Sequence, residues 1–197
     1  MRLAVLLRTA MGYAPPLAIA SVVILEGCTM PPSQAVQLQD GTVYFVEPPR
    51  LVEAATTYNE VNIWGATYYF TVSLPEKASE PLQQITINQR EGVDNIRFDL
   101  KNSVAFEGTR SRKGQPIGLK DVVQNRQART VSITFDPPVE PGKTITIGLK
   151  PLQNPSISGV YLFGVTAFPP GEKTHSQFLG FGRLQFYNYG RSFSPFW

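Results

Sequence analysis

The chain has 197 residues, of which 42% are hydrophobic and 17% are charged. This length predicts a single domain that buries enough surface to fold without disulfides or metal ions. Its formal net charge of +3 at pH 7 is too small to favour nucleic-acid binding.

Residues 1–35 have the pattern of an export signal. Arg2 and Arg8 give a positive start, and an apolar run follows at 17–25. This run is too short for a membrane-spanning helix, which needs about 20 apolar residues. We therefore expect 1–35 to be a signal peptide and the protein to be exported. It would then lie in the periplasm or be tethered to a membrane of the cell envelope. A short buried helix that stays on the protein is the alternative.

The end of this signal has two candidate cleavage sites. Leu25-Glu26-Gly27-Cys28 resembles a lipobox, although Glu26 stands where a small uncharged residue is usual. In that case 1–27 are removed, Cys28 carries a lipid anchor, and 29–35 form a linker. Ser33-Gln34-Ala35 is the rival site, and cleavage there leaves no anchor. Because Cys28 is the one cysteine, the folded domain has no disulfide and no thiolate.

From Val36 onward, alternating apolar and polar residues predict β-strands. In the clearest strand, 68–74, every second residue from Tyr68 to Leu74 is apolar. Strands 130–135 and 143–149 alternate in the same way, which is typical of antiparallel sheets with one face in water. Pro141-Gly142 between them suits a type II turn, because glycine readily adopts a positive φ. Weaker strands are expected at 42–46, 84–88, 95–100 and 104–107.

Two late strands, 159–168 and 178–187, are apolar on both faces. We therefore expect them in the centre of a sheet or against a partner. The stretch 108–118 predicts an exposed loop, and 120–126 is the candidate for a helical turn or two. Together these elements predict an all-β fold, a single antiparallel β-sandwich of immunoglobulin-like type over 36–187, with a small β-barrel as the alternative. An aromatic tail, 188–197, follows.

The sequence offers few residues for catalysis. His175, the one histidine, lies in a predicted loop with no nucleophile motif around it. Asp94 and Asp99 are close in sequence, with Glu91 nearby, and paired carboxylates can cleave glycans. With Asn95 they could hold calcium, but their spacing does not match a calcium-binding loop. We therefore predict no enzyme activity, no metal and no cofactor.

Six basic residues gather in one stretch of the chain, where Asp121 is the one acidic residue. They are Arg110, Arg112, Lys113, Lys120, Arg126 and Arg129. Such a cluster could attract an anionic partner, such as lipid headgroups, an acidic polysaccharide or an envelope protein. A solvated polar loop without a partner is the alternative. The aromatic tail is a second candidate surface, because aromatic rings stack on sugars or fill a partner's pocket.

Several segments together resemble one protein family. They are Val36-Gln37-Leu38-Gln39-Asp40-Gly41-Thr42, Pro48-Pro49-Arg50-Leu51, the stretch Phe135-Asp136-Pro137-Pro138-Val139-Glu140-Pro141-Gly142, Asn154-Pro155, and the stretches 159–169 and 178–187. The pattern is similar to that of an exported cyanobacterial family, the domain of unknown function 2808. The resemblance covers about 36–187. It implies export but no assigned activity, so no catalytic residue is carried over.

These observations favour a non-catalytic, exported cell-envelope domain with a binding or structural role. Two alternatives remain at this point. One is an enzyme that acts on envelope glycans through carboxylates, and the other is a periplasmic assembly or chaperone-like factor. The last would need an unpaired edge strand that is open to strand addition.

Overall fold

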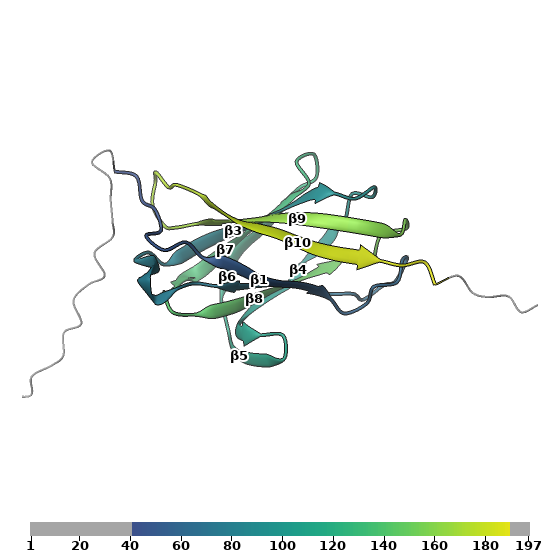
Figure 1. Cartoon of the computed structure of the whole chain (residues 1–197), viewed down its shortest axis with the longest axis horizontal. Helices are drawn as coiled ribbons and strands as arrows, with labels where there is room; N and C mark the ends of the chain where they lie inside the picture. The colour runs from purple at the N-terminus through teal and green to yellow at the C-terminus, as the bar shows by residue number, and fades with distance from the viewer. Residues whose placement is uncertain (1–40, 190–197) are drawn as a thin grey trace, which may run out of the picture. The chain divides into compact units, whose positions relative to one another are not determined.

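The computed structural model describes residues 41–189 (Figure 1). Over this range the chain forms strands and one short 3-10 helix, Glu76–Ala78. The strands are β1 (Arg50–Thr56), β2 (Tyr68–Ser73), β3 (Leu82–Glu91), β4 (Phe98–Thr109), β5 (Arg112–Pro116), β6 (Leu119–Asn125), β7 (Thr130–Val139), β8 (Thr144–Pro151), β9 (Gly159–Phe168) and β10 (Gln177–Phe186).

The strands form two five-stranded sheets in which neighbours are antiparallel. The first sheet has the order β1-β2-β8-β4-β5, and the second has the order β10-β9-β3-β7-β6. Their inner faces pack on one another, so the predicted β-sandwich is confirmed. The alternative, a closed β-barrel, is wrong, because the two sheets do not join into one.

Aromatic rings fill the centre of the core. The Tyr68 ring meets Phe98 edge-on at 5.9 Å and Phe163 at 6.1 Å, and Phe163 meets Phe70 at 5.7 Å. Burying each such side chain contributes roughly 1.5–3 kcal/mol. The buried Tyr68 hydroxyl donates to Oδ1 of Asn154 at 3.0 Å, and burial raises its pKa well above the ordinary value for tyrosine.

The predicted turn at Pro141-Gly142 has the expected glycine conformation, with φ of 84° at Gly142. It connects the two predicted strands, but these belong to different sheets: β7 to the second and β8 to the first. The turn also bonds to the end of β2, because the Gly142 amide donates to the Leu74 carbonyl at 3.0 Å. The turn therefore carries the chain across the sandwich.

The strongest alternating patterns are confirmed, whereas irregular segments differ from expectation. The two strands predicted at 95–100 and 104–107 are not separate, because the long strand β4, Phe98–Thr109, runs through both. The strand predicted at 42–46 is only an isolated bridge between Val43 and Thr174. The predicted loop at 108–118 contains strand β5, and the predicted helical turn at 120–126 is strand β6. Strand β1 was not expected at all.

Bulges explain two of these differences, those at β6 and β1. In β6 the register shifts between Leu119 and Asp121, so the extra residue breaks the alternation that would have marked a strand. Gln124 also points inward, where its amide donates to the Ile96 carbonyl and accepts from the Phe98 amide. In β1 the register shifts between Leu51 and Glu53.

Strand β9 lies inside the second sheet as expected, but β10 is an edge strand, so its predicted central place is wrong. Its two apolar faces have another cause. One face carries Leu184 and Phe186 into the core, and the other leaves Phe178 and Phe181 exposed, with their rings 5.1 Å apart.

The edge strands β1 and β10 approach closely and close one side of the sandwich (Figure 1). The contact point is Gly182 on β10. A Cβ atom there would lie 2.6 Å from Cβ of Ala54 on β1 and 3.1 Å from the Phe70 ring. These distances leave no room for a side chain, so glycine permits the two sheets to meet at this edge.

We predict that Gly182→Ala destabilises the domain by about 1–3 kcal/mol, the usual cost of overpacking a core. The free energy of unfolding in urea measures this effect. Ala54→Gly in the same chain removes the atom that would clash most closely and should restore part of the loss. Equal stability of Gly182→Ala and the wild type would show that the two edges do not meet as described.

Candidate functional site

The hairpin formed by β4 and β5 carries three of the six predicted basic residues: Arg110, Arg112 and Lys113. Gly108 permits its tight turn. Its φ is +86°, and a Cβ there would lie 2.2 Å from the Arg112 carbonyl oxygen. The Thr109 hydroxyl accepts from the Arg112 amide at 3.3 Å and contacts the Ser111 hydroxyl, which holds the tip of the hairpin in shape.

This hairpin folds across the outer face of the first sheet. The Thr146 hydroxyl on β8 donates to the Gly108 carbonyl at 2.7 Å, and the Arg110 guanidinium donates to the Thr56 carbonyl on β1 at 3.4 Å. Thr71 and Thr146 are consequently buried although they point away from the core. The expectation that this face lies in water is therefore wrong beneath the hairpin.

Two aromatic rings lie beneath the hairpin cations. The Arg110 guanidinium carbon and the Lys113 ammonium each lie 6.0 Å from the centre of the Tyr69 ring, and the ammonium lies 5.3 Å from that of Phe106. Such contacts contribute roughly 0.5–1 kcal/mol each when exposed. They hold the cations over the sheet while their outer sides remain in solvent.

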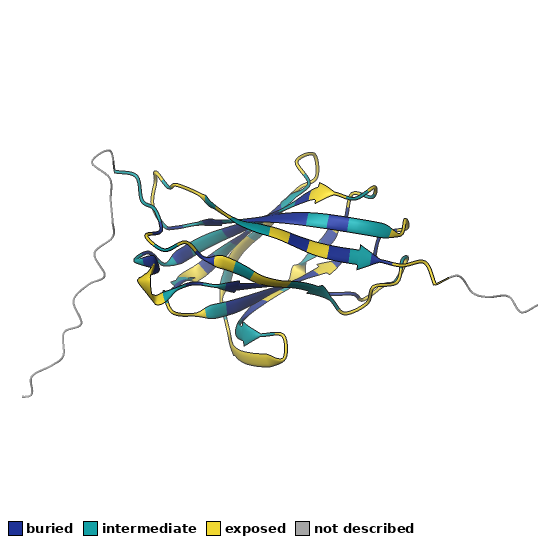
Figure 2. Cartoon of the chain, in the orientation of Figure 1, coloured by how far each residue is buried: buried dark blue, intermediate teal, exposed yellow. Residues whose placement is uncertain are grey.

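All of β5 is exposed, as Figure 2 shows in yellow at the foot of the molecule. Among residues 41–189, no carboxylate forms an ion pair with Arg110, Arg112 or Lys113. Nearby, Lys143 pairs instead with Glu107 on β4. The three cations therefore keep their charge available to a ligand.

The other three predicted basic residues lie elsewhere. Lys120 is exposed on β6, and Arg126 and Arg129 belong to the turn between β6 and β7. The Arg129 guanidinium donates to the Gly92 carbonyl at 3.2 Å, so it helps to hold the loop after β3. The hairpin is thus the one place in the described chain where three of the six share an element.

Sequence reasoning missed Tyr69 and Phe106 as parts of this site. The available signal was Tyr69 itself, an aromatic residue on the face of strand 68–74 that the pattern assigned to water. Nothing in the sequence indicated that the hairpin folds back onto that face, because the fold-back depends on contacts between residues such as Gly108 and Thr146 that are distant in the chain.

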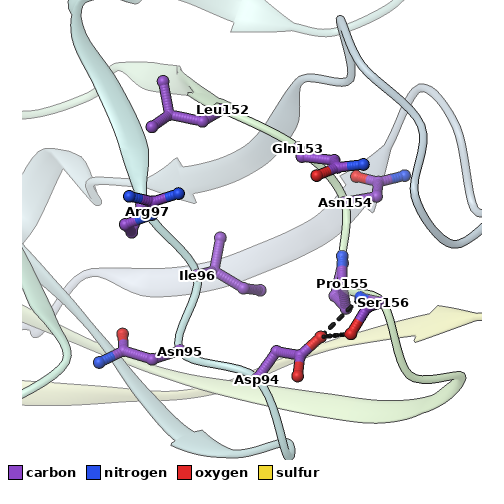
Figure 3. A pocket seen from close by; sticks show the side chains of 9 residues that line it. All are labelled: Asp94, Asn95, Ile96, Arg97, Leu152, Gln153, Asn154, Pro155 and Ser156. Carbon is purple, nitrogen blue, oxygen red and sulfur yellow. Dashed lines mark hydrogen bonds between the residues drawn. The ribbon is translucent and has the colours of Figure 1, made fainter.

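Asp94 lines a hollow of about 280 Å³ at another end of the sandwich (Figure 3). Its carboxylate accepts hydrogen bonds from the Ser156 amide, the Ser156 hydroxyl and the Ile157 amide. Desolvation acts to raise the pKa of Asp94, but these three hydrogen bonds outweigh it and leave the pKa below its ordinary value. Asp94 therefore holds two loops together.

We predict that Asp94→Asn lowers stability at pH 7 by about 1–2 kcal/mol, because the hydrogen bonds from Ser156 and Ile157 no longer go to a charged acceptor. Since the pKa of Asp94 is lower in the folded state than in the unfolded state, its contribution is complete above about pH 4 and is lost as the pH falls through the folded pKa. Urea unfolding should show that the difference in the free energy of unfolding between the wild type and Asp94→Asn is smaller at pH 2.5 than at pH 7. Asp121→Asn is the matched control, and an unchanged difference at both pH values would contradict this role.

Of the other predicted acidic and calcium-binding residues, Asn95 lines this hollow with Asp94, whereas Glu91 and Asp99 do not. Asp99 accepts instead from the Asn102 amide at 2.6 Å, and it does not line the hollow. Glu107 and Glu140 share a different hollow of about 230 Å³ with Lys143. His175 is exposed before β10. Over residues 41–189, no group of three or more His, Cys, Asp or Glu side chains is placed to hold a metal ion.

A comparison with protein-family models matches residues 42–186 to the family described as "Protein of unknown function (DUF2808)". The chain belongs to this DUF2808 family. The match confirms the resemblance seen in the sequence. A comparison with curated proteins found no match.

Solved structures similar to this DUF2808 chain share little sequence with it. The collagen-binding domain from a Staphylococcus aureus adhesin is 10% identical with a TM-score of 0.34, and the match covers 70% of this chain and 98% of that domain. A chain described as BspA_C_WT is 13% identical with a TM-score of 0.35, and the match covers 65% of this chain and 49% of that one.

The edges of the DUF2808 sandwich bear on the assembly-factor alternative. Bulges interrupt the pairing of the edge strands β1, β6 and β10, and β5 carries Arg112, Lys113 and Pro116. Bulges, charges and proline at edges are features that hinder the addition of a further strand. These edges therefore give no support to strand addition.

Other predicted features lie outside the described residues. Cys28, both candidate cleavage sites and most of the aromatic tail are among them. Of the tail, Asn188 and Tyr189 are described, and the Tyr189 ring lies 5.9 Å from that of Tyr187. Within 41–189 no helix has the length and apolar character that crossing a membrane requires.

Proposed function

We propose that this DUF2808 protein is a non-catalytic, exported domain of the cell envelope that binds an acidic polysaccharide through the β4–β5 hairpin. The observation that carries the proposal is the set of three hairpin cations. Arg110, Arg112 and Lys113 are exposed, have no carboxylate partner among residues 41–189, and lie on a hairpin held against the sheet.

The strength of exposed ion pairs favours a ligand with many charges. A single exposed pair contributes at most about 1 kcal/mol, so a small anion with one charge would bind weakly. A polymer with repeated acidic groups can contact all three cations at once, and its later contacts form at high effective concentration. Because the hairpin is held in place before binding, little conformational entropy is lost.

The absence of exposed large apolar side chains from the hairpin, 108–118, favours a polysaccharide over a lipid surface. Segments that lie within a membrane surface bury large apolar side chains beside their basic residues. Within 108–118, all of which is described, no large hydrophobic side chain is exposed. The hairpin therefore has the charge that an anionic surface attracts but lacks the side chains that would enter a bilayer.

An enzyme acting on envelope glycans is the second candidate. It is favoured by Glu107 and Glu140, which line one hollow, since paired carboxylates perform glycoside hydrolysis. Against it, Glu107 is already paired with Lys143. Release of new reducing ends from envelope glycan by the wild type, but not by Glu140→Gln, would favour the enzyme.

We predict that replacing Arg110, Arg112 and Lys113 together by alanine weakens binding to polygalacturonate about tenfold, since three exposed contacts of roughly 0.5 kcal/mol each are lost. Isothermal titration calorimetry measures this change. Wild-type binding should also weaken as salt is raised from about 50 to about 500 mM, because salt screens exposed charges.

The control variant removes the same number of exposed cations from other places, Lys77, Arg97 and Arg183. It should bind polygalacturonate like the wild type. Neutral dextran and vesicles containing phosphatidylglycerol are titrated as the two further ligands for comparison. Equal losses in both triple variants would contradict a hairpin site, and binding to vesicles but not to polygalacturonate would replace the polysaccharide by a lipid surface.

A further inference from the structure

The side of the sandwich opposite β1 and β10 is open. A groove of about 550 Å³ lies there between β4 and β6. Hydrogen bonds between the two walls limit it at both ends. At one end, the Ile117 backbone amide donates to the Ala105 carbonyl. At the other end, the Gln124 side-chain amide donates to the Ile96 carbonyl and accepts from the Phe98 backbone amide.

Irregular strand pairing produces this groove. Strand β4 pairs with β8 at Asp99 and again from Val104, so 100–103 bulge out of the register. Strand β5 joins β4 only from Phe106 onward. Strand β6 carries its own bulge at Lys120, the extra residue between Leu119 and Asp121. The two edges therefore face each other without pairing.

The walls of the groove are mainly apolar. Leu100, Ile117, Leu119 and Val122 are partly buried and pack against the core, and Val104 is 45% exposed. Covering apolar surface contributes about 25 cal/mol for each Å² removed from water. An aliphatic ligand would therefore gain free energy from these walls. The volume lies within the range of about 300–1,000 Å³ that is usual for small-ligand sites.

The rim of the groove is cationic. Lys101 from β4 and Lys120 from β6 line it, and neither forms an ion pair with a carboxylate of residues 41–189. Asp121 also lines it, but Asp121 pairs in register with Thr134, whose side chain is on the outer face of the second sheet. The charge at the mouth therefore complements an acid.

Ser103 adds a further polar group to the wall. Its hydroxyl oxygen is buried and has no hydrogen-bond partner among the described residues. A buried hydroxyl without a partner costs free energy. The wall therefore holds a polar atom that no described residue satisfies.

We infer that this groove binds a fatty acid, with the aliphatic chain along Leu100, Ile117 and Leu119 and the carboxylate between Lys101 and Lys120. The groove does not include the hairpin cations Arg110, Arg112 and Lys113, and it takes a ligand with a single charge, so it goes beyond the polysaccharide function. Here the apolar walls provide the affinity that exposed charge pairs alone would not.

Decanoate and its uncharged analogue decanol are the probes. Titration of the ¹⁵N-labelled protein should shift amide signals of 100–105 and 117–122. The double variant Lys101→Ala and Lys120→Ala should bind decanoate about fivefold more weakly, because two charge contacts of roughly 0.5 kcal/mol each are lost. It should bind decanol unchanged. The control variant, Lys77→Ala and Lys150→Ala, should bind both probes like the wild type.

The triple hairpin variant separates this inference from the polysaccharide function, because it should lose polygalacturonate and still bind decanoate. Preserved dispersion in the amide spectra verifies that each variant is folded. No binding of decanoate by the wild type, shifts confined to other strands, or equal affinity in the Lys101 and Lys120 variant would each overturn the inference.

Discussion

The close approach of β1 and β10 at Gly182 closes one side of the sandwich. Because Gly182 lies against Ala54 and the Phe70 ring, the two sheets meet along one edge. On the opposite side, β4 and β5 of the first sheet do not pair with β6 of the second sheet. The sandwich therefore has a closed side that supports the core and an open side. Both surfaces to which we assign ligands involve elements of the open side.

Strand β4 connects these two surfaces. Its first half bulges away from β8 and forms a wall of the apolar groove. Its second half pairs with β5 and folds over the outer face of the first sheet, which brings Arg110 and Lys113 above Tyr69. One strand thus passes from a mainly apolar groove that suits a ligand with one charge to an exposed hairpin that suits a ligand with many charges. The ligand classes follow from that contrast in burial and charge.

Sequence patterns predicted the strands that bury one regular face. Tyr68 and Phe70 point into the core as their alternation indicated. Strand 159–168, which is apolar on both faces, also matches β9. Patterns could not predict β5, which buries none of its residues, or β6, in which a bulge precedes an inward Gln124. The basic residues of the hairpin were recognised, but the rings beneath them were not, since Tyr69 and Phe106 meet the cations only through the fold-back. Asp94 was noticed as a carboxylate, whereas its role in holding Ser156 depends on a contact across 62 positions of the chain.

The central claim is that charge on a hairpin folded over the first sheet selects the partner of this DUF2808 protein. Amide chemical-shift mapping with a short oligogalacturonate tests it most directly. The account predicts shifts at 108–116 together with a change in the ring signals of Tyr69, because ligand and ring share the same cations. Shifts centred on β9 and β10 with the hairpin unchanged would contradict it.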